Sequence, residues 1–245
     1  MQRLSHLRVL LETQPQSGVW NMAVDEALLL SAISSEVATL RWYQWKEPTV
    51  SLGYFQKSAD FEVDSVLSKL PVVRRLSGGG AILHDCEWTY SLTVPPSQKL
   101  FSVPEELYDI VHGSLVASLN RLGFPIAARG VSSKLSEEPL LCFQRRDSHD
   151  LVVHGQKVVG SAQRRRRGAI LQHGSLILHA SAAAPAVAGL ADLCEAQVPP
   201  DLARVLAVPL AEAVAENWTF GELTEQEKQV AVELCSTDES RVNRR

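Results

Sequence analysis

The sequence contains few cysteines, and none of them form a closely spaced pair. The four cysteines, Cys86, Cys142, Cys194 and Cys235, stand far apart and make no Cys-x-x-Cys motif. Structural zinc sites and disulfide frameworks depend on recurring cysteine spacings, so we expect neither here, and we expect no bound metal. Unpaired thiols are typical of a reducing compartment. We therefore predict a cytoplasmic protein.

Long apolar runs and a strong charge bias are also missing. No apolar stretch approaches the roughly 20 residues that span a bilayer, and the first eight residues lack the apolar core of a secretory signal. With 24 basic and 28 acidic residues the formal net charge is −4, whereas nucleic-acid-binding domains are commonly basic. We therefore expect no membrane association and no nucleic-acid partner. The local exception is the arginine run 164–167, with Arg145 and Arg146 upstream.

What the sequence does contain is an ordinary globular composition. Apolar residues make up 45% and charged residues 21% of the 245 residues. A chain of this length can bury most of its apolar surface without disulfide or metal cross-links. We predict a single catalytic domain over residues 1–235 and a polar, disordered tail over 236–245.

Apolar periodicity predicts both helices and strands. Helical spacing is found over 17–31, about 61–70, about 104–122, and from 182 to about 234. Short segments with strand composition cover 38–43, 49–53, 71–75, 81–84, 88–94, 150–153, 156–160 and 169–178, and His154-Gly155 is the expected turn of one hairpin. Strands joined mostly as hairpins and segregated from helices predict an α+β fold with a mixed, mostly antiparallel sheet flanked by helices.

A glycine run is the first candidate site. Gly78, Gly79 and Gly80 follow Arg74 and Arg75. Three glycines let a ligand approach bare backbone amides, and paired arginines can bind an anion. The alternative is a plain turn between two strands. No Gly-Lys-Ser/Thr follows and no dinucleotide fingerprint is present, so the run is neither a phosphate loop nor a dinucleotide site.

A lysine and a cysteine are the other candidates. Lys157 follows the hairpin turn and would point into a cleft floored by Gly160 and Ser161, where an ammonium can stabilise an acyl oxyanion; a solvated lysine is the alternative. Cys142 lies among apolar neighbours and is either a buried side chain or a nucleophile. A nucleophile needs partial exposure and a stabilised thiolate, which a nearby lysine or arginine would supply.

Taken in order, seven segments resemble the lipoate–protein ligase A and octanoyltransferase families, which share a fold with biotin–protein ligases. Single segments are weakly specific, but their order over roughly residues 20–180 is highly specific. The segments are 21–27 (NMAVDEA), 41–45 (RWYQW), 51–54 (SLGY), 74–85 (RRLSGGGAILHD), 142–143 (CF), 155–163 (GQKVVGSAQ) and 171–176 (LQHGSL).

The resemblance implies a role for each matching position. The acyl ligand would lie against Arg75, Ser77, Gly78, Gly79 and Gly80, with His84 at the end of the motif. Lys157 would contact the acyl carbonyl, and Gly160, Ser161 and Ala162 would continue the same wall.

The position of the cysteine implies the chemistry. One octanoyltransferase class carries its cysteine after the lysine motif; a second class carries it before, in a Cys-Phe pair, as Cys142-Phe143 stands here. The resemblance therefore implies an octanoyltransferase without cofactor. Octanoyl–acyl carrier protein would acylate Cys142, and a lysine of a lipoyl domain or a glycine-cleavage H-type protein would accept the chain. The thiol's base is left open between His84 and His173.

Other interpretations remain open at this point. An ATP- and Mg-dependent lipoate ligase would use the same fold without needing Cys142. An amidotransferase that moves the acyl group between lipoyl-bearing proteins would also use a cysteine thioester. A non-catalytic scaffold or ligand-binding relative would carry out no acyl transfer. A biotin ligase is disfavoured because no Gly-Arg-Gly-Arg loop is present. The basic run 164–167 is either a docking site for acidic partners or an exposed loop.

Overall fold

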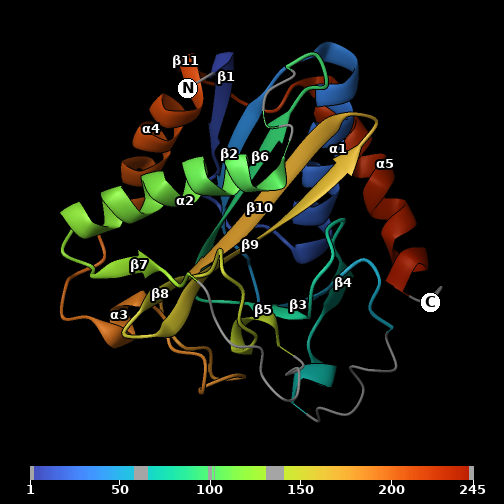
Figure 1. Ribbon diagram of the computed structural model, residues 1–245. Coiled ribbons are helices and arrows are strands. Elements are labelled where there is room, and N and C mark those ends of the chain that lie inside the picture. The colour runs from blue at the N-terminus through green and yellow to red at the C-terminus, as the bar shows by residue number, and fades with distance from the viewer. Residues whose placement is uncertain (1–2, 58–65, 99–100, 102, 131–140, 243–245) are drawn as a thin grey trace.

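An eight-stranded mixed sheet forms the centre of the molecule, which we describe from a computed structural model (Figure 1). The structure describes residues 3–57, 66–98, 101, 103–130 and 141–242. The strand order is β11-β1-β2-β6-β10-β9-β8-β7. The strands are β1 (Leu4–Leu11), β2 (Thr39–Tyr43), β6 (Glu87–Val94), β7 (Ile126–Ala128), β8 (Leu151–Val153), β9 (Gln156–Arg166), β10 (Ala169–Ile177) and β11 (Ala215–Phe220).

The pairing is parallel only at one edge of this sheet. β1 runs parallel to both β11 and β2, and every other neighbouring pair is antiparallel. A smaller sheet, in the order β4-β3-β5, consists of β3 (Thr49–Leu52), β4 (Val72–Arg74) and β5 (Ile82–His84). The glycine run connects β4 to β5. The predicted α+β fold with a mostly antiparallel mixed sheet is thus confirmed.

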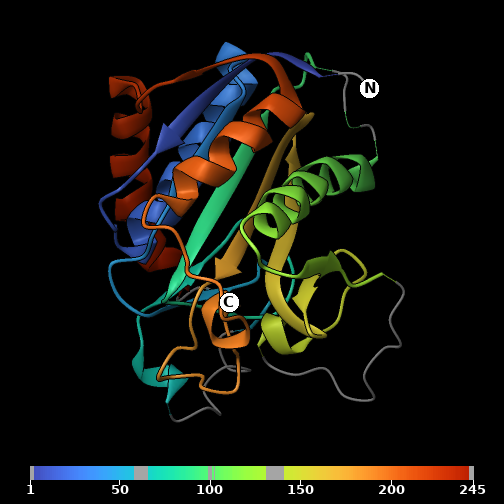
Figure 2. The same ribbon diagram turned by 90° about the vertical axis from the view of Figure 1, so that its left-hand side faces the viewer.

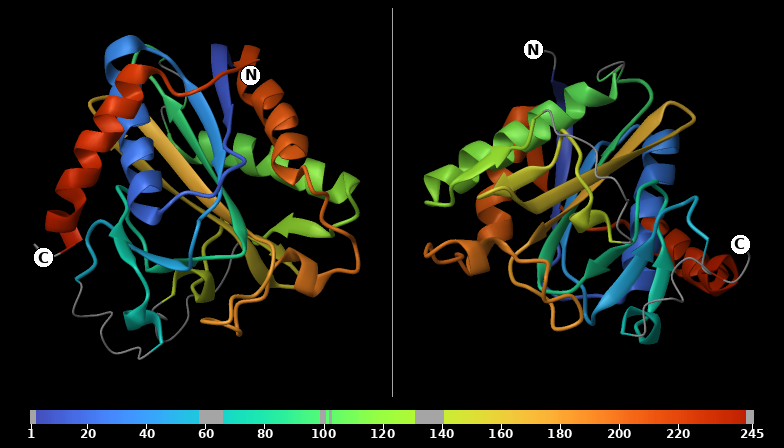
Figure 3. Two further views of the ribbon diagram at one scale, coloured as in Figure 1. Left: turned by 180° about the vertical axis from the view of Figure 1, so that it is seen from behind. Right: turned by 60° about the horizontal axis from the view of Figure 1, so that its bottom comes forward.

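Helices cover both faces of the large sheet. α2 (Pro104–Arg121) and α4 (Leu202–Val214) lie together on one face, and α1 (Gly18–Ser35) lies on the other with α5 (Glu225–Val242) packed behind it (Figures 1 and 2). A short helix, α3 (Leu190–Leu193), precedes α4. The small sheet lies at one end of this layered body, beside the lower end of β9 and β10 (Figure 3, right).

Alternation along the strands determines which side chain enters which core. On β10, Ile170 joins the large cluster that includes residues of α2 and α4, whereas Leu171 packs with Leu29 of α1. Successive side chains of a strand point to opposite faces, so a strand covered on both faces is apolar without a period-two pattern. This explains why all nine residues of β10 are buried.

Most of the predicted elements are confirmed where the structure describes them. Ser17 caps α1 by accepting a hydrogen bond from the Trp20 amide at 3.3 Å. Pro104 begins α2, where proline costs no hydrogen bond. The hairpin turn lies at His154-Gly155, where both residues have positive φ (49° and 79°), as a two-residue turn that matches the strand twist requires.

Three strands lie outside the sequence prediction. The sequence pattern predicts no element at β1 or β7, and β11 falls inside the segment predicted to be helical. β11 is a largely exposed edge strand, and its partner β1 lies about two hundred residues earlier in the chain. Trp218, Thr219 and Phe220 are residue types that favour strands, but β11 follows α4 directly and lies within a long alanine- and leucine-rich segment whose pattern predicts a helix.

Two further predictions concern the helix at 61–70 and the tail at 236–245. The first half of the helix predicted at 61–70, residues 61–65, lies outside the described residues; in the described half, Leu67–Lys69 form a single turn of 3-10 helix. No element boundary lies at 235, because α5 continues to Val242 and thus into the segment expected to be a disordered tail. Extending a helix whose first turns are anchored costs little. Within the described residues, every helix is too short or too polar to cross a membrane.

Candidate active site

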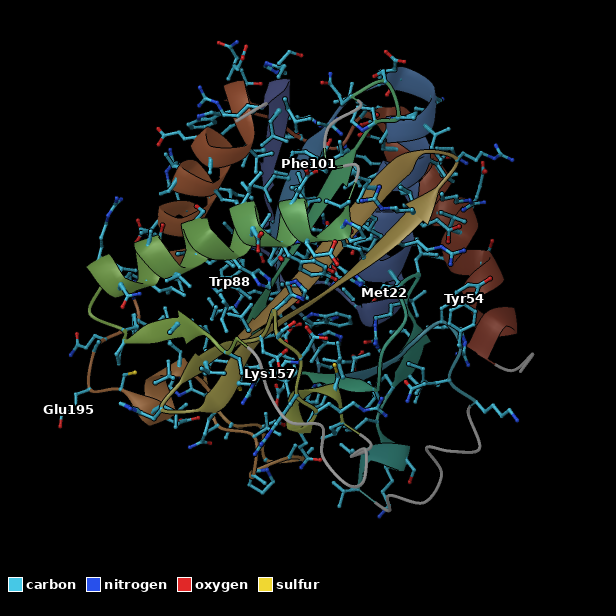
Figure 4. All side chains as sticks on the ribbon, viewed as in Figure 1. Met22, Tyr54, Trp88, Phe101, Lys157 and Glu195 are labelled. Carbon is cyan, nitrogen blue, oxygen red and sulfur yellow. The ribbon has the colours of Figure 1, made fainter. Side chains whose placement is uncertain are left out.

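A cavity of about 420 Å³ opens where the small sheet meets β9 and β10. Its walls come from α1, the glycine run, β5, the turn after residue 141, the start of β9 and the middle of β10. The lining residues are Met22, Tyr43, Arg75, Gly78, Gly79, Gly80, Ile82, His84, Thr89, Tyr108, Cys142, Phe143, Arg145, Arg146, Asp147, Asp150, Lys157, Gly160, Ser161, Ala162, Gln163, His173, Gly174 and Ser175. Figure 4 labels two of them, Lys157 and Met22, among all the side chains. Of the predicted site residues, Ser77 alone is absent from this lining.

Cys142 is held at the cavity wall by the backbone of the glycine segment. Its amide donates a 2.7 Å hydrogen bond to the Ala81 carbonyl, and Leu141 pairs with Ala81 as a parallel bridge. Cys142 then begins a single 3-10 turn, Cys142–Gln144. Phe143 turns into the protein and is buried, while Cys142 is half-buried. The cysteine is therefore the partly exposed member of the Cys-Phe pair, as a nucleophile requires.

Lys157 faces this cysteine from the start of β9. Its Nζ lies 3.8 Å from Cys142 Sγ and 3.4 Å from the Cys142 carbonyl oxygen. The side chain is 4% exposed, and its charge is balanced by Asp150, whose Oδ1 lies 2.6 Å from Nζ. An ammonium at this distance stabilises a thiolate and any negative charge that develops on a thioester bound there.

Gly160 makes room for this lysine. A Cβ at position 160 would lie 2.5 Å from Lys157 Cε and 2.9 Å from Nζ. The two residues are three apart on β9, and the lysine side chain folds back along the strand over the glycine. The spacing between Lys157 and Gly160 therefore has a steric explanation: the end of the lysine side chain packs against the glycine, where any side chain would collide with it.

The buried side chain of Arg75 holds the glycine run in place through hydrogen bonds. Its guanidinium donates to the carbonyls of Ser51 (2.8 Å), Gly78 (2.7 Å) and Gly80 (2.6 Å). Arg74 likewise donates to the carbonyls of Gly53 and Gln56. Burial lowers the pKa of Arg75 to about 10. The terminal guanidinium nitrogens of both arginines thus donate to backbone oxygens and hold the loop in shape, and anion binding by this pair stays a prediction.

Two buried histidines near the glycine run each contact a carboxylate through Nδ1 and a serine hydroxyl through Nε2. His84 contacts Glu87 through Nδ1 (2.8 Å) and Ser51 through Nε2 (2.8 Å). His173 lies 3.6 Å from Asp25 through Nδ1 and bonds the Ser77 hydroxyl through Nε2. Ser77 is therefore a fully buried anchor of the loop.

Neither histidine is a partner of the cysteine. Burial lowers the pKa of His84. In the described part of the chain, no hydrogen bond joins His84 or His173 to Cys142, so neither candidate base gains support from this geometry.

Ser161 belongs to a polar network behind the cavity wall. Its hydroxyl bonds Tyr90 (2.7 Å) and His112 of α2 (2.8 Å), and Gln172 donates to the Tyr90 oxygen (3.0 Å). Burial lowers the pKa of His112 to about 4, so this imidazole is neutral near pH 7. The network joins β9, β10 and α2 and fixes the wall that Ser161 and Ala162 provide.

The basic run 164–167 closes the β9–β10 hairpin. Arg164 lies over the Tyr54 ring (4.7 Å to its centroid), Arg165 donates to the Phe101 carbonyl (2.7 Å), and Arg166 pairs with Glu26 (3.0 Å). Three of the four side chains are thus engaged within the chain, which does not favour a free docking patch.

Asp150 is the main site residue that the sequence did not reveal. It is 3% exposed and lies between Lys157 and Arg129, whose Nε is 3.4 Å from Oδ2. It also accepts a 2.8 Å hydrogen bond from the Asp147 amide. The available signal was an acidic residue directly before the apolar run of β8, which by itself does not distinguish a buried ion pair from a turn residue.

The family follows from comparison with known proteins. Residues 17–228 match the lipoyl protein ligase A/B catalytic domain. The chain belongs to this family. In the described residues, no group of three or more histidine, cysteine, aspartate or glutamate side chains is arranged to hold a metal ion.

The chain is similar to curated proteins named octanoyltransferase LipM. The chain is 37% identical to an octanoyltransferase LipM of Kyrpidia tusciae, over 93% of this chain and 94% of the relative. It is 43% identical to an octanoyltransferase LipM of Carboxydothermus hydrogenoformans, over 66% of this chain and 61% of the relative. These similarities confirm the prediction of an acyltransferase.

Solved structures share the fold. A putative lipoate protein ligase from Thermoplasma acidophilum superposes with a TM-score of 0.74 at 23% identity, covering 96% of this chain and 95% of that one. A lipoate-protein ligase A bound with ATP superposes with a TM-score of 0.71 at 23% identity, covering 95% and 94%. The predicted lipoate ligase-like fold is confirmed.

Proposed function

We propose that this protein is an octanoyltransferase that moves an octanoyl group from acyl carrier protein, through a thioester on Cys142, to a lysine of a lipoyl-bearing acceptor protein. The observation that carries the proposal is the 3.8 Å separation of Cys142 Sγ and Lys157 Nζ in the wall of the cavity. The names of the relatives support the octanoyl group.

In the first half-reaction the Cys142 thiolate attacks the carbonyl carbon of octanoyl–acyl carrier protein. The new carbon–sulfur bond forms as the bond to the pantetheine sulfur breaks, and that sulfur leaves as a thiolate and takes up a proton. One thioester replaces another, so the step needs no ATP. Lys157 stabilises the tetrahedral oxyanion with its ammonium.

In the second half-reaction the neutral amine of the acceptor lysine attacks the acyl-enzyme. An amide bond forms, the Cys142 sulfur leaves as a thiolate, and the nitrogen gives up its surplus proton to solvent. An amide is more stable than a thioester, so this step runs towards the modified acceptor. The Lys157 ammonium stabilises the oxyanion of this second tetrahedral intermediate, as it does in the first half-reaction.

The cavity has space and apolar contacts for a medium-length chain. Met22, Ile82 and Phe143 contribute apolar surface to its lining. Each buried methylene stabilises the bound chain by about 0.8 kcal/mol. Octanoyl is thereby favoured over acetyl by several such increments.

The partners follow from this chemistry, and the setting from the unpaired thiols of the sequence. The donor is acyl carrier protein, and the acceptor is a lipoyl domain or a glycine-cleavage H-type protein. The reaction uses no cofactor and takes place in the cytoplasm.

The test is intact mass of the purified chain after incubation with octanoyl–acyl carrier protein in the absence of ATP. We expect a hydroxylamine-labile octanoyl adduct on the wild type and none on Cys142→Ala. Cys86→Ala is the matched control. Cys86 is exposed as a residue, but the partial desolvation of its thiol and the neighbouring Asp85 raise the pKa of that thiol, so it is a poor nucleophile. The adduct should therefore persist in this variant. An acceptor domain added afterwards should remove the adduct and gain the octanoyl mass.

Two results would decide against this mechanism. Acceptor modification that requires ATP and free octanoate, and survives Cys142→Ala, would identify a ligase. Transfer only from one modified lipoyl-bearing protein to another, with no reaction of the carrier protein, would identify an amidotransferase.

A further inference from the structure

The two half-reactions use Cys142 and Lys157 but leave the Ser161 hydroxyl in the cavity wall without a role. Ser161 is half-buried and lines the cavity. Its Oγ lies 2.8 Å from Nε2 of His112, which is buried and does not line the cavity. One serine hydroxyl therefore stands between a buried imidazole and the bound substrate, and a hydroxyl and an imidazole at this distance can exchange a proton.

The imidazole of His112 presents an unprotonated nitrogen to this hydroxyl. Burial lowers the pKa of His112 to about 4, so the ring is neutral near pH 7 and carries a single N–H. A backbone hydrogen bond to His149 favours the protonated ring, which means that the ring N–H donates there to the His149 carbonyl. Nε2 is then left as an acceptor, and the Ser161 hydroxyl donates to it.

The other hydrogen bonds of the network run in the same direction. Gln172 donates to the Tyr90 oxygen at 3.0 Å, and burial raises the pKa of Tyr90 to about 12, so its phenol keeps its proton. That proton is donated to Ser161 Oγ at 2.7 Å. A hydroxyl can accept two hydrogen bonds and donate one. Ser161 thus donates to His112, accepts from Tyr90, and has one acceptor position left for a molecule in the cavity.

Two glycines leave space for this hydroxyl beside the Lys157 ammonium. Gly174 faces Ser161 across the β9–β10 pair, and a Cβ there would collide with Ser161 Oγ and lie 2.7 Å from the Tyr90 ring. Gly160 directly precedes Ser161, and a Cβ there would lie 2.9 Å from Lys157 Nζ. Neighbouring Cα atoms are about 3.8 Å apart. Ser161 therefore lies next to the place where Lys157 meets a developing oxyanion.

The free acceptor position of Ser161 calls for a donor on the bound molecule. An octanoyl chain and its thioester have no N–H or O–H group. The attacking lysine of the acceptor protein has one, and its nitrogen must come within bonding distance of the thioester carbon on Cys142. The amides of the pantetheine arm also carry N–H groups, but an ethylene group separates the nearest of them from the sulfur.

We propose that Ser161 and His112 form a proton relay that takes the surplus proton of the acceptor lysine in the second half-reaction. This inference rests on the proposed function. The carbon–nitrogen bond forms and the carbon–sulfur bond breaks, so Cys142 leaves as a thiolate. The nitrogen gives its proton to Ser161 Oγ while the Ser161 hydroxyl gives its own proton to His112 Nε2. The imidazolium returns the proton to solvent after the modified acceptor has left.

The charges around His112 favour a transient carrier of the proton. Burial opposes the imidazolium, as do His149 and Lys157, whereas Asp147 and the backbone hydrogen bond to His149 favour it. The ring is therefore ready to accept a proton near pH 7 and releases it readily afterwards. A weak base is sufficient because an amide nitrogen cannot keep the surplus proton once the carbon–sulfur bond breaks.

The test compares two ways of discharging the octanoyl-enzyme, which is first loaded from octanoyl–acyl carrier protein and then followed by intact mass. The first nucleophile is a lipoyl domain at saturating concentration, whose lysine must lose a proton as the amide forms. The second is mercaptoethanol, which attacks as a thiolate and has no proton to lose. The measured quantity is the ratio of the amine rate to the thiol rate, in which any general damage to the cavity cancels.

The variants are Ser161→Ala and His112→Gln. We expect each to lower the ratio by about 100-fold, the size of a general acid–base contribution, with acylation of Cys142 and thiol discharge nearly unchanged. The matched control is Tyr90→Phe, which removes a hydroxyl of the same network but keeps the bond between Ser161 and His112. Its two discharge rates should change together, so the ratio should stay at the wild-type value.

Three results overturn the inference while the proposed function stands. One is a ratio that neither Ser161→Ala nor His112→Gln changes. Another is a ratio that falls equally in Tyr90→Phe, because the network would then act only through the shape of the wall. The third is slower acylation from the carrier protein in Ser161→Ala with an unchanged ratio, which assigns the hydroxyl to the pantetheine amides. If octanoyl-Cys142 does not form in the wild type, the proposed function itself fails, and the inference fails with it.

Discussion

Nζ of Lys157 lies 2.6 Å from Oδ1 of Asp150, and both side chains are almost completely buried. The carboxylate thus compensates the charge of the lysine that faces the cysteine. Removing one member of a buried pair leaves an uncompensated charge, at a cost of about 3 kcal/mol or more.

The first prediction concerns this pair. Asp150→Asn should slow acylation of Cys142 by about tenfold or more, because the ammonium loses the anchor that aims it, and should lower the free energy of unfolding by about 3 kcal/mol. Asp109→Asn, an exposed carboxylate of α2, should do neither. A double-mutant cycle separates positioning from general damage: Asp150→Asn should slow acylation no further in a Lys157→Met background. Additive effects would contradict the assignment.

The second prediction tests the floor beneath the lysine. Gly160→Ala places a Cβ 2.5 Å from Lys157 Cε. The lysine tip is the more flexible partner, so it should move, and acylation should fall by about tenfold or more while the protein stays folded. Gly113→Ala is the matched control, since a Cβ there meets no atom within 4 Å. It should leave acylation unchanged and stabilise α2 by about 0.5–1 kcal/mol. Equal rates for the two variants would sink the steric explanation.

The third prediction concerns acid stability. Burial lowers the pKa of His112 to about 4, from an ordinary value near 6.5, and the charge of Lys157 acts in the same direction. The unfolded state therefore binds the extra proton first. The stability that the folded state has with His112 neutral is fully present above pH 6.5 and is lost as pH falls from 6.5 through 4, by about 3 kcal/mol in all. Urea unfolding at pH 7 and pH 4.5 should show a smaller acid-induced loss for His112→Gln than for the wild type. An identical loss would show that His112 is not the linked group.

The fourth prediction concerns the docking of α5. Glu227 accepts two hydrogen bonds from Arg8 of β1 (2.6 and 3.0 Å), and its side chain is 4% exposed. Glu227→Gln should lower the free energy of unfolding by about 2 kcal/mol, between the values for surface and fully buried pairs. Glu225→Gln removes a carboxylate that is 90% exposed and pairs with Lys228 in the same helix. Thermal unfolding should distinguish the two, with no measurable change for the second.

Local elements of the fold were predictable because their causes lie within a few residues. His154-Gly155 forms the hairpin turn because both residues adopt positive φ, and the apolar spacing over α1 and α2 identified these helices without tertiary information. β11 was missed because its extended form depends on β1 at the other end of the chain. Its three strand-favouring residues, Trp218, Thr219 and Phe220, are too short a signal to stand out from the helical segment that precedes them.

The candidate site shows the same division. Cys142, Lys157 and the glycine run were identifiable from their order in the sequence, and the structure lines one cavity with them. Their roles were only partly identifiable: Arg75 supports the loop from within, Ser77 is buried against His173, and Asp150 was not recognised. Hydrogen-bond partners of buried polar groups depend on which strands become neighbours, and that is not a local property.

By itself the sequence determined the hairpin turn and the principal helices and singled out the candidate site residues, because each depends on residue type at short spacing. The distance of 3.8 Å between Cys142 and Lys157 was decided by tertiary structure alone. This distance has two causes. One backbone hydrogen bond to Ala81 fixes the cysteine beside the small sheet, and the β8–β9 hairpin of the large sheet positions the lysine opposite it. Two residues fifteen positions apart meet at that distance only because two sheets are packed against each other.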